Sequence, residues 1–106
     1  MRAGPLRHRI AVEQVAEHQD PDGSVIEVWS TYATVHASIE PITAREYFAA
    51  QSTQADVTHR ISLRYLSGTI PKMRVNYNSR IFDILSVINV GERNRELQLM
   101  CRESVD

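Results

Sequence analysis

The four histidines and the single cysteine are the residues of this chain whose types could bind a metal ion or act as nucleophile and base. The histidines lie in separate segments, and none has the HxH or HExxH spacing that places two imidazoles on one metal. They are His8, His18, His36 and His59. Cys101 is in phase with Leu97 and Leu99, which indicates a small buried side chain rather than a nucleophile with a base beside it. We therefore expect no catalytic, metal-binding or cofactor-binding residues.

Two further patterns have a chemical interpretation. The segment Asp20-Pro21-Asp22-Gly23 resembles the start of a calcium loop but lacks the downstream acidic ligands. Proline presets φ, aspartate can cap backbone amides and glycine accepts positive φ, so the segment predicts a hairpin turn. Trp29, Tyr32 and Tyr47 could stack on bases, but without a basic groove they are expected in the core or at an interface.

Length and charge limit the function classes. With 106 residues the chain has room for one domain, residues 1–106, and its 42% hydrophobic and 24% charged residues are typical of a globular domain. No apolar run approaches the ~20 residues of a membrane-spanning helix, so no membrane partner is expected. The net charge of −1 argues against electrostatic DNA binding. Lys72 is the only lysine, and this preference for arginine favours protein–protein contacts, although a GC-rich genome would produce it too.

The apolar pattern predicts an all-β chain of about six or seven strands. Residues 25–40 form a long β stretch whose second half alternates between polar and apolar residues, and residues 57–65 alternate throughout. Residues 73–101 form three strands of a meander broken at Asn78-Ser79 and at residues 91–94. In the first strand, residues 8–17, a change of phase indicates a β-bulge near Glu13-Gln14. We expect a small antiparallel β-barrel, because closure removes exposed sheet edges.

One short helical insertion is predicted within this β pattern. Thr43-Ala44-Arg45-Glu46 has the form of a capping box, and Ile42 and Tyr47 can form a hydrophobic staple around it. The apolar face ends after about two turns, so the helix needs tertiary or partner contacts to persist.

Alternation also predicts the core and one contact surface. One set of positions should face inward: Val35, Ile39, Val57, Ile61, Leu63, Ile84, Leu97, Leu99 and Cys101. Arg60 and Arg64 project from the opposite face of their strand, where we expect them to contact neighbouring subunits.

The order of these segments resembles the phage head–tail adaptor family, also described as head-closure or head–tail joining proteins. The matching pieces are LRHRI at residues 6–10, the DxxG turn, Trp29 followed by VxAxIEP at 35–41, REYFAA at 45–50, THRISLRY at 58–65 and the meander at 73–101. Each piece alone is a plausible strand or turn, and the resemblance rests on their order and spacing over almost the whole chain.

The resemblance implies a virion protein without catalytic activity, assembled in the cytoplasm of a bacterial host. Family members form a ring, commonly of twelve copies, below the portal protein of a DNA-filled head. The ring closes the head, lets genomic DNA pass without sequence-specific binding, and gives a tail-terminator or tail-completion protein its attachment surface. The resemblance also places one segment near the channel, with Thr43, Arg45, Glu46, Tyr47, Phe48 and Gln51 as candidate assembly residues.

Two alternatives remain open from the sequence. A tail-completion or tail-terminator protein has a similar build and would bind the tail tube rather than the portal. A small nucleic-acid-binding barrel would bind DNA in a salt-sensitive way. An enzyme is the least favoured class. Whether the particle is a phage, a prophage product or a gene-transfer particle is left open.

Overall fold

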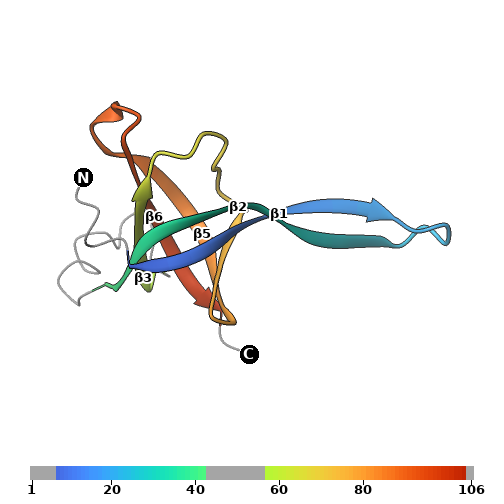
Figure 1. The fold of residues 1–106 in the computed structure, drawn as a ribbon. Helices are drawn as coiled ribbons and strands as arrows, with labels where there is room; N and C mark the ends of the chain where they lie inside the picture. Colours follow the sequence, from blue (N-terminus) through green and yellow to red (C-terminus); the bar gives the residue numbers. More distant parts are fainter. Residues whose placement is uncertain (1–6, 43–56, 105–106) are drawn as a thin grey trace.

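Alternating apolar residues and tight turns produce six antiparallel strands in the computed structural model, which describes residues 7–42 and 57–104 (Figure 1). Their order around the sheet is β1-β2-β3-β6-β5-β4, and β4 pairs with β1 to close a barrel. The strands are β1 (His8–Gln19), β2 (Val25–Pro41), β3 (His59–Arg64), β4 (Arg74–Tyr77), β5 (Arg80–Asn89) and β6 (Glu96–Ser104). A single 3-10 turn, η1 (Val90–Glu92), joins β5 to β6. The predicted all-β barrel is confirmed.

The barrel interior is filled by one side-chain set from every strand, as the period of two requires. Phe82 is the largest fully buried side chain, and Ile61, Leu63 and Leu99 are likewise inaccessible to solvent. Seven of the nine predicted core residues are buried, whereas Val35 and Ile39 are half-buried at its edge. The core also takes residues that were not predicted: Ile10, Val12, Ala37, Met73, Val75 and Phe82.

The predicted turns are present, with geometry that matches their residues. Asn78 and Ser79 both have positive φ (52° and 68°), which is a type I′ hairpin turn between β4 and β5. At the other hairpin, the Gly23 amide donates to the Asp20 carbonyl (2.9 Å) and the Ser24 amide to the Asp22 carboxylate (2.9 Å). The Asp20–Gly23 segment is therefore a turn, as predicted.

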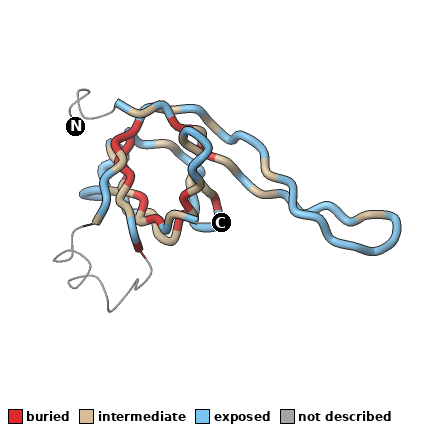
Figure 2. Tube along the Cα trace, turned by 90° about the horizontal axis from the view of Figure 1, so that it is seen from below, coloured by how far each residue is buried: buried red, intermediate tan, exposed pale blue. Residues whose placement is uncertain are grey.

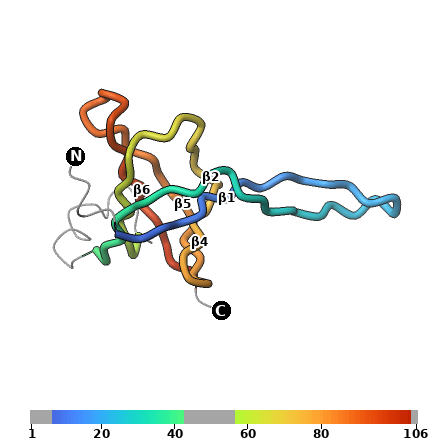
Figure 3. Tube along the Cα trace, in the orientation of Figure 1, coloured from blue at the N-terminus to red at the C-terminus, as the bar shows by residue number. Residues whose placement is uncertain are grey.

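Strands β1 and β2 are longer than the barrel and leave it together as a projecting ribbon (Figures 1 and 3). The pairing register shifts after Val12, which pairs with Ala33, while Glu13 pairs with Thr31. The predicted bulge is therefore at this level, but the extra residue is Tyr32 of β2 rather than a residue of β1. A bulge bends the ribbon and increases its twist, which directs it away from the barrel.

The base of this ribbon is held on both sides. The Arg74 side chain of β4 donates to Glu13 of β1 (2.6 Å) and lies over the Trp29 ring of β2, 4.1 Å from its centre. The Tyr32 hydroxyl donates to the Ser67 carbonyl (2.6 Å) and lies against Gly68, whose φ of +83° and close approach require glycine.

The predicted helical insertion after Ile42 lies outside the described residues.

We predict that Leu99→Ala destabilises the fold by about 2–5 kcal/mol, because it leaves a cavity in a fully buried site. Val25→Ala is the matched control: its side chain is 63% exposed at the end of the ribbon, and it should change stability by less than about 0.5 kcal/mol. Urea unfolding followed by circular dichroism measures both. A loss below about 1 kcal/mol for Leu99→Ala contradicts the core assignment.

Candidate assembly surfaces

The barrel end where β2 finishes and β3 begins carries the best-defined polar site. The Ile42 amide donates to the Thr58 carbonyl (2.9 Å), and Pro41 pairs with His59, so the chain leaves and re-enters the barrel at one point. The candidate assembly residues of the intervening segment lie outside the described residues: Thr43, Arg45, Glu46, Tyr47, Phe48 and Gln51.

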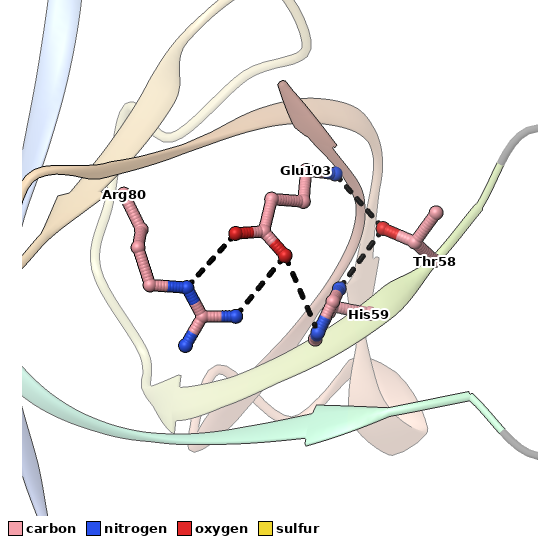
Figure 4. Close-up of polar contacts among 4 residues, drawn as sticks. All are labelled: Thr58, His59, Arg80 and Glu103. Carbon is pink, nitrogen blue, oxygen red and sulfur yellow. Dashed lines mark hydrogen bonds and ion pairs between the residues drawn. The ribbon is translucent and has the colours of Figure 1, made fainter. Parts of the chain in front are cut away.

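Next to this point, side chains from three strands and from Thr58, the residue before β3, form a cluster (Figure 4). Arg80 of β5 makes a bidentate contact with the Glu103 carboxylate of β6, with distances of 2.9 and 3.1 Å. The Glu103 amide donates to the Thr58 hydroxyl (2.8 Å), which is 2.9 Å from His59 Nδ1. His59 Nε2 is 3.9 Å from Glu103 Oε1, and the His59 ring lies edge-on against the buried Phe82, 5.1 Å between ring centres.

The surroundings of this cluster lower two pKa values. The hydrogen bond from Arg80 lowers the pKa of Glu103, and partial burial lowers the pKa of His59, against the raising effect of Glu103. In both groups the environment favours the deprotonated form.

Thr58, His59 and Glu103 have the residue types of a hydrolase triad, but not its geometry. Both oxygens of Glu103 are held by Arg80, and the 3.9 Å separation from His59 exceeds hydrogen-bond length. The cluster is built to fasten three strand ends together. It is a structural clamp beside the exit of the 43–56 segment.

The two arginines expected at subunit contacts differ in their surroundings. Arg60 donates to Glu40 of the neighbouring strand (3.1 Å), so part of its charge is matched within the subunit. Arg64, at the end of β3, is exposed. As predicted, both project from the face opposite Ile61 and Leu63.

The remaining reactive side chains give no sign of a second site. Burial raises the pKa of the Cys101 thiol to about 12, which keeps it protonated and unreactive at neutral pH. His8 lies edge-on against Tyr77, with 4.9 Å between ring centres. In residues 7–42 and 57–104 no three acidic, histidine or cysteine side chains gather as metal ligands. Over the same ranges, no helix has the length and apolar character needed to cross a membrane.

The clamp was missed by sequence reasoning. Its members come from three distant segments, and which of them meet depends on the register of β3, β5 and β6, which alternation alone leaves undetermined. The only local signal was the Thr58-His59 pair next to the end of an expected loop.

The described residues thus form a closed barrel with a projecting ribbon, and no three acidic, histidine or cysteine side chains among them gather as a metal site. The family of phage head completion proteins matches residues 1–104. The chain belongs to that family, and it is therefore a non-enzymatic structural component of a virion.

Solved structures share its fold. The solution structure of protein SF1141 from Shigella flexneri 2a is 26% identical, with a TM-score of 0.83 over 100% of this chain and 99% of that one. A chain in the virion of a native gene transfer agent particle is 19% identical, with a TM-score of 0.64 over 95% of this chain and 97% of that one. No curated protein matches significantly.

We predict that the clamp makes folding stability depend on pH. The folded pKa values of Glu103 and His59 lie below their ordinary values, so the unfolded chain binds more protons. The free energy of unfolding keeps its full value above the ordinary histidine pKa of 6.5. It decreases as the pH falls below 6.5, where His59 takes up a proton more readily in the unfolded chain, and decreases further below 4.5, where Glu103 does the same. Arg80→Gln should flatten the acid part of this loss, measured by urea unfolding between neutral and acid pH at low salt.

Arg102→Gln is the matched control for this variant. Arg102 contacts Asp83 at a longer distance (3.7 Å) between two more exposed side chains, and such pairs contribute little. It should keep the wild-type pH dependence. Equal slopes for wild type and Arg80→Gln would show that the clamp does not set the acid response.

Proposed function

We propose that this head completion protein is a head–tail connector subunit that forms a ring below the portal, closes the DNA-filled head and presents the tail attachment surface. The observation that supports it most is that the family of phage head completion proteins matches residues 1–104. A tail-terminator role has no observation of its own in its favour.

The shape of the subunit suits a ring. A ring needs two different surfaces that meet when copies are related by rotation. The barrel supplies one rigid body, and the ribbon of β1 and β2 projects from one side of it (Figure 1). The molecule measures 48 × 28 × 27 Å, so the ribbon extends well past the barrel and is long enough to contact an adjacent copy.

The direct test is to mix the purified protein with portal rings and examine them by electron microscopy. We expect an added layer of density on the tail-facing side, with the rotational symmetry of the portal. Purified tail tubes of the same particle are the comparison. Binding to tail tubes with no layer on the portal would assign the protein to the tail instead.

We further propose that the 43–56 segment faces the channel of the ring and helps to retain DNA. The support is its place in the chain: it leaves the barrel at Ile42 and returns at Thr58, where one backbone hydrogen bond closes its base. None of the barrel pairings depends on it, because β2 ends at Pro41 and β3 starts at His59.

We predict that replacing residues 47–54 with a glycine–serine linker leaves the barrel folded but yields particles that lose their DNA. Unfolding by urea checks the fold, and nuclease sensitivity of the packaged DNA checks retention. Replacement of the β4–β5 turn residues Asn78-Ser79 by Asn-Gly, which suits the same type I′ turn, is the control and should leave retention intact. Particles that hold DNA with the linker would contradict the channel role.

A further inference from the structure

The ribbon formed by residues 14–30, which we call the arm, has no partner strand within the described part of the subunit, although Arg74 of β4 covers Trp29 at its base. Strand β1 pairs with β4 only through residues 11–13, and β2 pairs with β3 only from Ala37 onward. Beyond these points the two strands pair only with each other. Figure 2 shows the arm as an almost continuously exposed stretch. An isolated two-stranded ribbon is marginally stable in water, so the arm is suited to a partner.

The two faces of the arm differ in chemistry. Opposed residues share a face, and one face carries the pairs Ala16–Val28 and His18–Ile26. Ile26 and Val28 are 43% and 49% exposed. The other face carries the carboxylate pair Glu17–Glu27 between the pairs Val15–Trp29 and Gln19–Val25. The two carboxylates lie directly opposite each other, and Val25 on the same face is 63% exposed.

The Glu17–Glu27 pair is unfavourable in the isolated subunit, because like charges directly opposite in a ribbon repel. No ion pair reaches either carboxylate within residues 7–42 and 57–104. The sequence places no lysine or arginine between residues 10 and 44. The arm holds four of the chain's thirteen carboxylates and none of its twelve lysines and arginines, so the rest of the chain is net positive.

The complementary charge lies on the barrel. Arg9 of β1 pairs with His36 of β2. Ala37, the residue after His36, pairs with Leu63 of β3, so Arg64 lies close to the level of Arg9. Arg64 in turn pairs with Glu96 of β6. This register brings exposed cations onto neighbouring strands and the turn before β6. We call them the arginine surface: Arg9, Arg64, Arg93 and Arg95.

The arginine surface has unmatched positive charge and apolar neighbours. Glu92 and Glu96 lie in the same region and offset part of the charge, but no ion pair to these four arginines occurs among the residues described. Tyr65 and Val90 beside them are 40% and 37% exposed. The surface therefore offers both cations and apolar contact area, the two properties that the arm needs.

We propose that the arm of one copy binds the arginine surface of the next copy, with Glu17 and Glu27 facing its arginines. This inference rests on the proposed ring and names the contact that holds its subunits together. Figure 1 shows the arm projecting to one side of the barrel and the β5–β6 turn on the other, so the two surfaces cannot meet within one subunit. Such a head-to-tail contact adds copies in one direction and closes into a ring when the rotation allows.

The test uses charge reversal in pairs. The arm variant carries Glu17→Arg and Glu27→Arg, and the barrel variant carries Arg64→Glu and Arg95→Glu. Each alone should lose self-association, because its arm and its barrel then repel. An equimolar mixture should regain it, since every arm then meets a surface of opposite charge. Sedimentation and two-dimensional NMR at low salt and about 1 mM protein detect a contact with a Kd of about 1 mM.

A neutral variant separates this contact from a purely structural role. Glu17→Gln with Glu27→Gln removes the repulsion, so amide exchange in the arm of the monomer should slow while self-association weakens. If the carboxylates only shaped the ribbon, association would be unchanged.

Several results would overturn the proposal. They are wild-type protein with no shifts at the arm and the arginine surface, a mixture that fails to associate, and an arm that shifts only when portal is added. The last result would assign the arm to the portal. Binding of the arm variant to portal rings is measured in a separate experiment. If the arm variant still forms a normal layer on portal rings, the proposed contact between arm and arginine surface is rejected, while the proposed function is not affected.

Discussion

The closure of the barrel between β1 and β4 is the interaction on which the other features depend. Only residues 11–13 of β1 pair with β4, so a short ladder turns an open sheet into a barrel. The Arg74–Glu13 ion pair, half-buried with its guanidinium over Trp29, reinforces that ladder at its last pair. A charged hydrogen bond shielded by an aromatic ring is stronger than an exposed one. Closure here both completes the core and marks the point where the arm begins.

The β1–β4 closure also separates two regions of the molecule that differ in how their strands are stabilised. On the barrel side, buried apolar side chains from six strands stabilise one another. On the arm side, β1 and β2 pair only with each other, and beyond Trp29, which Arg74 covers, most side chains are exposed on both faces. For a protein that acts as a monomer, exposed valine and isoleucine side chains and two opposed carboxylates on a ribbon bring no gain in stability. A subunit that binds a neighbour through the Glu17–Glu27 face does gain stability, because the contact neutralises the charge and covers Val25 on the same face.

The clamp of Arg80, Glu103, His59 and Thr58 stabilises the end of the barrel where β2 finishes and β3 begins. It fastens β3, β5 and β6 where the 43–56 segment leaves and returns, so that changes in this segment need not disturb the barrel. A structural component of a virion has reason to combine a stable body with separate contact regions.

Local sequence determined the strands, the turns and the inward side of β2, β3 and β6, because these depend on alternation and on residues such as Asn78, Ser79 and Gly23. It also indicated the family through the order of its segments. Tertiary structure alone decided which strands are neighbours, which placed Ile10, Val75 and Phe82 in one core. Tertiary structure also decided that the bulge residue is Tyr32, that Arg60 forms an ion pair with Glu40, and that β1 and β2 extend beyond the barrel. The physical reason is that register and barrel closure are set by contacts between segments far apart in the sequence, and the residue pattern along one strand does not specify those contacts.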